Sequence, residues 1–93
     1  MNNQTISNNG PIKIQVVFYA HLKTAAGTDA TEVELPAQAT VADLKTVLKH
    51  RFPALGYQLV NTVTFINKQT LYLDNETLPD GAMVTFLPPM AGG

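Results

Sequence analysis

The chain contains no cysteine and no tryptophan, and Ser7 is its only serine. Without cysteine it has no disulfide framework, no thiolate nucleophile and no Cys-based zinc site. A single serine near the start argues against a serine-hydrolase triad. The sequence is therefore poor in the side chains that usually carry out catalysis in small enzymes.

Charge is also scarce. Six Lys and Arg stand against seven Asp and Glu, and charged residues make up 14% of the chain, against about 25% in average domains. A nearly neutral chain lacks the basic surface of a nucleic-acid binder, so we expect no nucleic-acid partner. The longest apolar stretch, residues 16–20, has five residues, whereas a membrane span needs about 20, so we expect no membrane contact.

Length and composition predict one small folded domain between a disordered leader and a flexible tail. The 93 residues are 45% hydrophobic, enough for one modest core. Residues 1–11 are polar and Asn-rich, which predicts a disordered leader. The leader also lacks the pattern of a signal peptide, so we expect a cytoplasmic protein. Residues 12–87 form the predicted folded domain, and residues 88–93 a flexible tail.

Alternation of apolar and polar residues predicts five strands. The first places Ile12, Ile14, Val16, Phe18 and Ala20 on one face and leaves Val17 and Tyr19 on the other. In the last strand, Val84 and Phe86 would point inward and Met83, Thr85 and Leu87 outward. For the third strand, pattern alone puts Val63 and Phe65 inside. The predicted strands are residues 12–20, 30–35, 62–67, 70–73 and 82–87.

One main helix is predicted at residues 41–52. Thr40 precedes it and Asp43 follows three residues later, close to a capping box, while Lys45 is expected to face solvent. Residues 21–27 predict a short helical turn or loop that ends at Gly27, and residues 54–59 a turn of irregular helix. Two strands, a helix and three strands predict an α+β fold, in which a mixed sheet of four to five strands packs on one main helix.

The C-terminal residues are the most informative segment. Pro88 and Pro89 hold a chain extended, and six extended residues reach about 20 Å. Gly92 and Gly93 have no side chains, so their backbone can enter a narrow channel and present the terminal carboxylate to a partner. The alternative is a frayed terminus that ends in glycines by chance.

The sequence resembles the β-grasp sulfur-carrier family, which includes the small subunit of molybdopterin synthase. The matching segments include VVFYAHLKTAAG, ATVADLKTVL and LPDGAMVTFLPPMAGG. The pattern is shared with archaeal ubiquitin-like modifiers and, more loosely, with the thiamine sulfur carrier. The ending Phe86-Leu87-Pro88-Pro89 favours the molybdopterin branch and the archaeal modifiers. The likeness covers residues 12–93; its segments are 16–27, 33–36, 39–48, 52–55, 66–67 and 78–93.

The resemblance implies that Gly93 is the reactive group. A ubiquitin-activating-type adenylyltransferase would use ATP and magnesium to adenylate it, and a sulfur donor, a desulfurase or a rhodanese-like protein, would convert it to a thiocarboxylate. The large synthase subunit would take up the tail and pass the sulfur to a cyclic pyranopterin. This chain would then be a non-catalytic small subunit that binds no cofactor or metal, a monomer alone and part of a heterotetramer with the large subunit. The tail-insertion residues would be Pro88, Pro89, Met90, Ala91 and Gly92.

The resemblance also bears on the partner surface. In the family the residue before the Asn, here Ile66, is the inward one, which would expose Val63 and Phe65. Four residues would then form an exposed apolar patch next to the tail. The alternative is a scatter of surface apolar residues, which is common. The four predicted partner-binding residues are Val17, Tyr19, Phe65 and Leu87.

Three functions remain open at the level of sequence. One is the sulfur carrier of molybdenum cofactor biosynthesis, and a sulfur carrier for another pathway is a variant of it. Another is a ubiquitin-like protein modifier that forms isopeptide bonds through Gly93. The last is an interaction module with no chemistry at its terminus.

Overall fold

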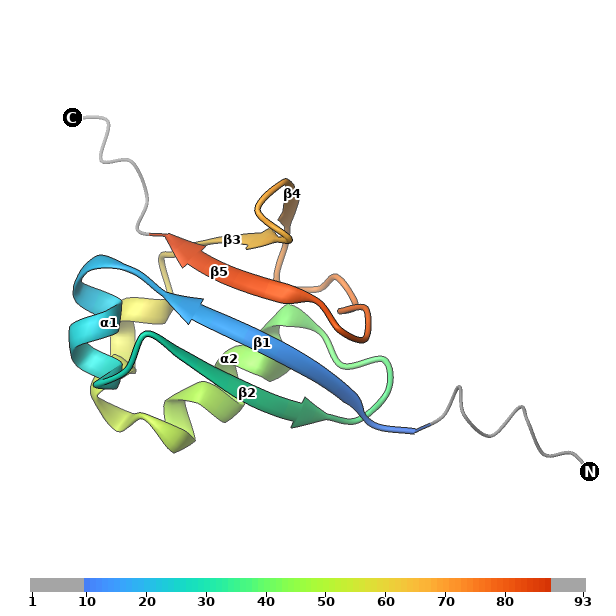
Figure 1. The fold of residues 1–93 in the computed structure, drawn as a ribbon, viewed down its shortest axis with the longest axis horizontal. Helices are drawn as coiled ribbons and strands as arrows, with labels where there is room; N and C mark the ends of the chain where they lie inside the picture. The colour runs from blue at the N-terminus through green and yellow to red at the C-terminus, as the bar shows by residue number, and fades with distance from the viewer. Residues whose placement is uncertain (1–9, 88–93) are drawn as a thin grey trace, which may run out of the picture.

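The computed structural model describes residues 10–87, which form a single five-stranded mixed sheet with helices against it (Figure 1). The strands lie in the order β2-β1-β5-β3-β4. Along the chain the elements are β1 (Ile12–Phe18), α1 (Ala20–Ala26), β2 (Ala30–Leu35), α2 (Val41–Arg51), the 3₁₀ segment η2 (Pro53–Leu59), β3 (Val63–Ile66), β4 (Thr70–Tyr72) and β5 (Met83–Leu87).

The pairing of the strands confirms the predicted α+β architecture. β1 runs antiparallel to β2 and parallel to β5, and β3 runs antiparallel to both β5 and β4. A parallel pair needs a crossover connection, and the long segment between β1 and β5 includes α2, which packs across one face of the sheet (Figure 1). Two strands, a main helix and three more strands in this order make a β-grasp fold.

The core lies between α2 and the sheet. Inward residues of β1 and β5 are fully buried, and α2 contributes Leu44 and Leu48. Phe18 meets Phe52 edge to face, with ring centroids 5.7 Å apart. In β3, Ile66 is buried while Val63 and Phe65 are only half-buried. The inward position that the resemblance implied is confirmed, and the pattern-only prediction for Val63 and Phe65 was wrong.

Two local predictions at the first strand and helix were tested. β1 ends at Phe18, so the prediction that Ala20 continues its inner face was wrong. Ala20 has a φ of 54° and begins α1, and the change of direction removes it from the strand. The helix ends at Gly27 in the left-handed conformation, with φ of 77°, as its glycine predicted.

The start of α2 is closed by its own cap and by a distant loop. Thr40 and Asp43 form the predicted capping box. The N–H groups of Val41 and Ala42 donate to the carbonyls of Glu76 and Asp74, at 3.1 and 2.9 Å. These bonds satisfy helix N–H groups that have no partner within the helix, and they fix the loop before β5 against α2.

Lys45 does not face solvent as predicted. It is buried, its Nζ lies 3.0 Å from Oδ1 of Asp74, and the same Nζ lies 5.9 Å from the centroid of the Phe86 ring. The aliphatic stem covers core surface, and the ammonium group reaches out to a partly exposed carboxylate. The prediction was wrong because the partner lies 29 residues further along the chain.

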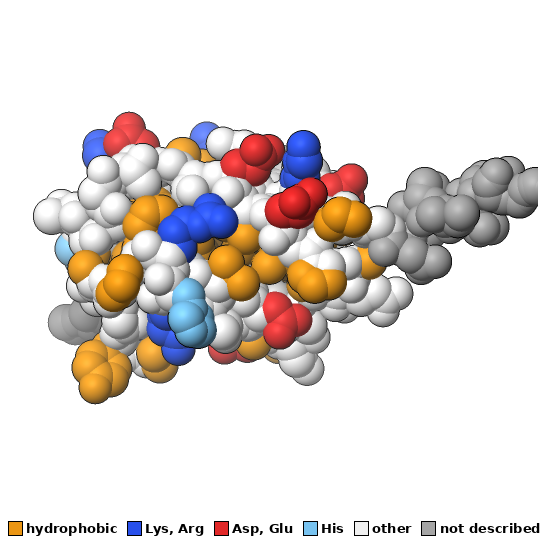
Figure 2. Space-filling model, turned by 90° about the horizontal axis from the view of Figure 1, so that it is seen from below, with side chains coloured by type: hydrophobic (Ala, Val, Ile, Leu, Met, Phe, Trp, Pro, Cys, Tyr) orange, Lys and Arg blue, Asp and Glu red, His pale blue; other side chains and the backbone are white. Residues whose placement is uncertain are grey.

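Opposite the β3–β4 edge, the molecule presents a mixed surface. Acidic, basic and apolar side chains are interspersed on this side (Figure 2). No helix within residues 10–87 has both the length and the apolar character needed to cross a membrane. The predicted leader and tail lie outside the described residues, apart from the last two residues of the leader, so the domain boundaries stay predictions.

Candidate functional site

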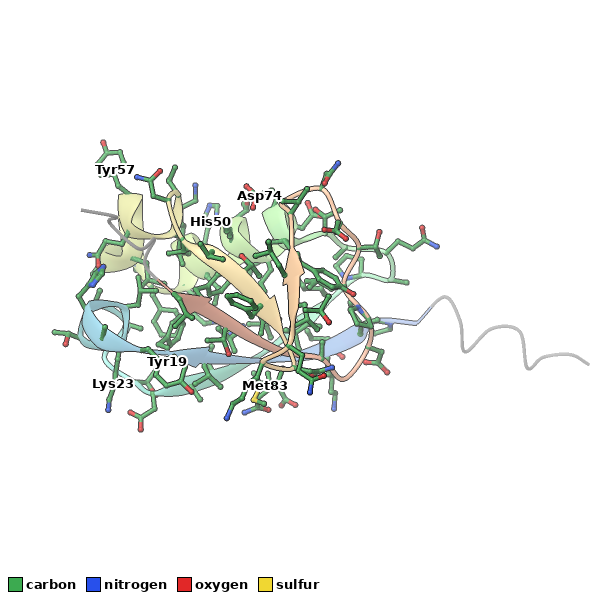
Figure 3. The ribbon with its side chains drawn as sticks, turned by 90° about the horizontal axis from the view of Figure 1, so that it is seen from above. Tyr19, Lys23, His50, Tyr57, Asp74 and Met83 are labelled. Atoms are coloured by element: carbon green, nitrogen blue, oxygen red, sulfur yellow. The ribbon has the colours of Figure 1, made fainter. Side chains whose placement is uncertain are left out.

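The sheet face that points away from α2 changes character along its strands. At one end it carries Lys13 opposite Glu34 and Gln15 opposite Glu32. Tyr19 and Met83 lie on one side of the sheet, and His50 and Tyr57 on the other (Figure 3). Toward the end of β5 the outward residues are mostly apolar. This apolar end is where the chain leaves the sheet at Leu87 to enter the tail.

The sheet brings the four predicted partner-binding residues to this end. Val17 pairs with Thr85, and Thr85 pairs with Phe65 on its other side, so the three form one row across β1, β5 and β3. Leu87 pairs with Val63 in β3. Tyr19 follows β1 and is 40% exposed, and Val17, Phe65 and Leu87 are half-buried. We call Val17, Tyr19, Phe65 and Leu87 the outer apolar surface.

A pocket of about 400 Å³ lies in this surface. Three of the four residues, Tyr19, Phe65 and Leu87, line it, and the other two lining residues are Lys68 and Thr85. Val17 is not among the lining residues, although it pairs with Thr85, which is one of them. The pocket therefore lies between the residue that follows β1, the strands β3 and β5, and the turn after β3.

Sequence reasoning missed Lys68 and Thr85. Thr85 points outward as predicted, but only 4% of it is exposed, and its Oγ1 has no hydrogen-bond partner among the described residues. Lys68 is exposed, and it lies in the turn between β3 and β4 with a φ of 64°. A threonine between the inward Val84 and Phe86 was the available signal for one of them. Only the three-dimensional structure places Lys68 beside the last strand.

The neighbouring Asn67 holds this turn against β5. Its N–H donates to the carbonyl of Met83 at 2.7 Å, and its Oδ1 accepts from the Met83 N–H at 3.0 Å. Asn67 also has a positive φ, 54°, a conformation that Asn adopts more readily than most residues. The double contact fixes the backbone of the turn, and with it the root of the Lys68 side chain.

Leu71 extends the apolar surface to the edge strand. It pairs with Phe65 and is 52% exposed. The sequence predicted the strand at residues 70–73 but did not assign a face to Leu71. The apolar end of the sheet therefore reaches from β1 to β4.

The acidic side chains of the last third of the chain have partners within the fold. Asp80 accepts from the N–H of Lys13, and Glu76 accepts from the N–H of Leu73. Asp74 binds Lys45. Within residues 10–87 no group of three His, Asp or Glu residues is placed to hold a metal ion.

The described residues offer an apolar binding surface at this end of the sheet. The expected reactive group, Gly93, and the tail-insertion residues Pro88–Gly92 lie outside the described residues. What the structure does describe is Leu87, the last residue before them, at the apolar end of the sheet.

Sequence comparisons give matches over nearly the whole chain. The model of the ThiS family matches residues 16–93. The molybdopterin synthase sulfur carrier subunit of Escherichia coli (strain K12) is 34% identical over 82 residues, which cover 86% of this chain and 99% of that protein. The protein of the same name from Chlamydomonas reinhardtii is 30% identical, over 88% of this chain and all of that protein.

Solved structures share the fold. The Haloferax volcanii small archaeal modifier protein 1 matches with a TM-score of 0.77 and 21% identity, over 85% of this chain and 99% of that one. A Pyrococcus furiosus protein assigned as molybdopterin converting factor subunit 1 gives 0.72 and 30%, with the same shares of coverage. A chain in the complex of subunits 1 and 2 of the molybdopterin-converting factor from Helicobacter pylori gives 0.61 and 20%, over 88% of this chain and 100% of that one.

Proposed function

Because the chain belongs to the ThiS family, we propose that it is the sulfur carrier subunit of a molybdopterin synthase and acts in the cytoplasm. The observation that carries this proposal is its likeness to the Escherichia coli molybdopterin synthase sulfur carrier subunit, which extends over 99% of that protein. The Gly92-Gly93 ending supplies the carboxylate that such a carrier needs.

The proposed chemistry takes place at the Gly93 carboxylate. A free carboxylate is a poor electrophile, so an activating partner of the ubiquitin-activating type, which uses ATP and magnesium, joins it to the AMP of ATP, and pyrophosphate leaves. The outer sulfur of a donor persulfide then attacks the acyl-adenylate and displaces AMP, and a thiol cleaves the resulting acyl disulfide to leave a thiocarboxylate at Gly93. The large synthase subunit receives the tail and transfers this sulfur to a cyclic pyranopterin. The acid, base and nucleotide-binding groups for these steps belong to the partners.

We propose that the large subunit docks on the outer apolar surface. A relative of the same fold is known from a complex of subunits 1 and 2 of the molybdopterin-converting factor. The surface includes Leu87, so a partner bound there is close to the start of the six-residue tail, which would reach about 20 Å if extended. Half-exposed aromatic and aliphatic side chains of this kind are typical anchors of protein interfaces.

Intact mass spectrometry tests the carrier chemistry. The protein is incubated with its activating enzyme, ATP and a sulfur source. We expect a mass increase equal to the replacement of one oxygen by sulfur, located at Gly93. A variant that lacks Gly92 and Gly93 is the matched control and should stay unmodified. An unchanged mass of the wild-type protein, with an activating enzyme that modifies a known carrier, would contradict the proposal.

Binding to the large subunit tests the docking surface. The double variant Tyr19→Ala, Leu87→Ala should bind at least about a hundredfold more weakly, because it truncates two interface anchors. Wild-type affinity of this variant would show that the partner docks elsewhere.

A ubiquitin-like modifier is the second candidate, favoured by the TM-score of 0.77 to a small archaeal modifier protein. Both functions share the activation step and differ in what receives the acyl group. Gly-Gly remnants on lysines of other proteins, found by peptide mass spectrometry in cells that express the chain, would support the modifier. If deletion of Gly92 and Gly93 were harmless in cells, both candidates would fail and a plain interaction module would remain.

A further inference from the structure

The pocket in the outer apolar surface contains a buried hydroxyl group that does not stabilise the isolated domain. Thr85 lies there at 4% exposure, and its hydroxyl finds no hydrogen-bond partner among residues 10–87. A buried hydroxyl without a partner lowers stability, and valine would fill nearly the same space without that cost. A group that costs the free protein stability is expected to gain something in a complex.

A cation borders the same pocket. Lys68 is the one charged residue among the lining side chains, and the salt bridges found within the described part of the chain, Lys23–Asp29 and Lys45–Asp74, do not include it. The Asn67 contacts to Met83 hold the backbone of this turn in place. The pocket therefore combines one exposed cationic side chain, whose backbone is held in place, with one hydroxyl that has no partner among the described residues.

The walls of the pocket are apolar. Tyr19, which follows β1, supplies them together with Phe65 of β3 and Leu87 of β5. An occupant must have an apolar stem to contact these walls and a polar end to meet Thr85 and Lys68. An ammonium group can only donate, and a threonine hydroxyl can donate, so the polar end must accept. A carboxylate accepts from both at once, and its charge complements the lysine.

We propose that this pocket receives a single glutamate or aspartate side chain of the large synthase subunit. This inference rests on the proposed function and adds the chemistry of one contact to it. The methylene stem lies against Phe65 and Leu87, and the carboxylate accepts hydrogen bonds from the Thr85 hydroxyl and the Lys68 ammonium group. In the free protein the Thr85 hydroxyl is covered, and rotation about χ1, which exchanges the hydroxyl and the methyl group, turns it toward the occupant.

The charge of Lys68 also makes the contact specific for partners that carry an acidic residue. A purely apolar surface attracts many partners, whereas a buried carboxylate is tolerated only where donors meet it. The pocket would thus select a large subunit with an acidic residue at one place. Partners that present a lysine or an apolar residue there would lose affinity.

Two substitutions test the two polar groups of the pocket separately. Thr85→Val should leave the free protein as stable as wild type or more so, while it weakens binding to the large subunit of the same organism about tenfold. Lys68→Gln should also weaken binding about tenfold, with most of the loss disappearing at high salt. The matched control is Lys13→Gln, which removes a lysine from the polar end of the same face and should change affinity less than about twofold.

The outcomes separate this inference from the proposed function. Isothermal titration calorimetry gives the affinities, and urea denaturation gives the stabilities. If Thr85→Val and Lys68→Gln bind like wild type while Leu87→Ala binds weakly, the carboxylate contact is wrong and the docking surface stands. If wild-type protein does not bind the large subunit at all, the function fails and the inference fails with it.

A double-mutant cycle identifies the carboxylate. Each surface Asp or Glu of the large subunit is changed to its amide and combined with Lys68→Gln. One position should show strong coupling, so that the double variant is no weaker than either single variant. Additive effects at every acidic position would overturn the proposal.

Discussion

The two sides of the sheet differ in whether a buried polar side chain has a partner within the fold. Beneath α2, Lys45 is buried over Phe86 and pairs with Asp74 at 3.0 Å. On the outer side, Thr85 is buried with no partner among the described residues, and Lys68 is exposed above it. Folding alone thus supplies the Lys45 ammonium group with a partner. On the outer side, the proposed carboxylate of a partner would satisfy the Thr85 hydroxyl.

The largest expected difference between the sides comes from two neighbours in β5. Phe86 points inward and is fully buried, while Leu87 points outward and is half-buried. Phe86→Ala should lower the free energy of unfolding by about 3–5 kcal/mol. Leu87→Ala should lower it by about 1 kcal/mol, because less apolar surface is lost. Urea denaturation measures both, and equal losses would show that the two sides contribute alike to stability.

Removal of Asp74 tests how much the pairing of Lys45 with Asp74 contributes to stability. Asp74→Ala leaves the Lys45 ammonium group without its carboxylate, and we expect a loss of about 1–2 kcal/mol in the free energy of unfolding. Lys45→Met is the comparison, since methionine keeps an apolar stem over Phe86 and leaves only a partly exposed carboxylate unpaired. It should cost less than Asp74→Ala. A larger cost for Lys45→Met would mean that the ammonium group stabilises the fold through contacts other than Asp74, such as that with the Phe86 ring.

The cap of α2 gives a smaller effect on the same side. Thr40→Ala removes the hydroxyl that accepts from the Asp43 N–H, and the free energy of unfolding should fall by about 1 kcal/mol. Thermal unfolding followed by circular dichroism measures the change. Thr40→Ser, which keeps the hydroxyl, should restore most of the loss.

The smallest effect is expected at the edge of the outer side. Leu71 is 52% exposed on β4, so Leu71→Gln should change the free energy of unfolding by less than about 0.5 kcal/mol. The same variant should bind the large subunit more weakly if the docking surface extends to β4. A large loss of stability instead would mean that the outer side also supports the fold.

Much of the fold could be predicted from sequence because the signals are local. Alternation identified the strands, Thr40 and Asp43 identified the start of α2, and Gly27 marked the end of α1. Ala20 was misplaced because the chain turns there through a positive φ that no residue type announces.

The rest depended on pairing between distant segments. In VTFI at residues 63–66, side-chain hydrophobicity favours Val63 and Phe65 as inward residues. The register with β5 decides otherwise, because it places Phe65 beside the outward Thr85. For the same reason sequence alone could not join Lys68 to Thr85, or Lys45 to Asp74. Alternation alone placed Val17, Tyr19 and Leu87 on the outer side, whereas Phe65 joined them only because the resemblance had suggested which way β3 faces.

The position of β5 has a mechanical consequence. It is not an edge strand but lies between β1 and β3, with hydrogen-bonded ladders on both sides. A pull on the chain beyond Leu87, along the strand axis, loads both ladders together in shear instead of opening one of them pair by pair. A partner that pulls the C-terminus into its active site would therefore not detach β5 from the sheet. The sheet should also stay intact when the terminus is released and passed to the next partner.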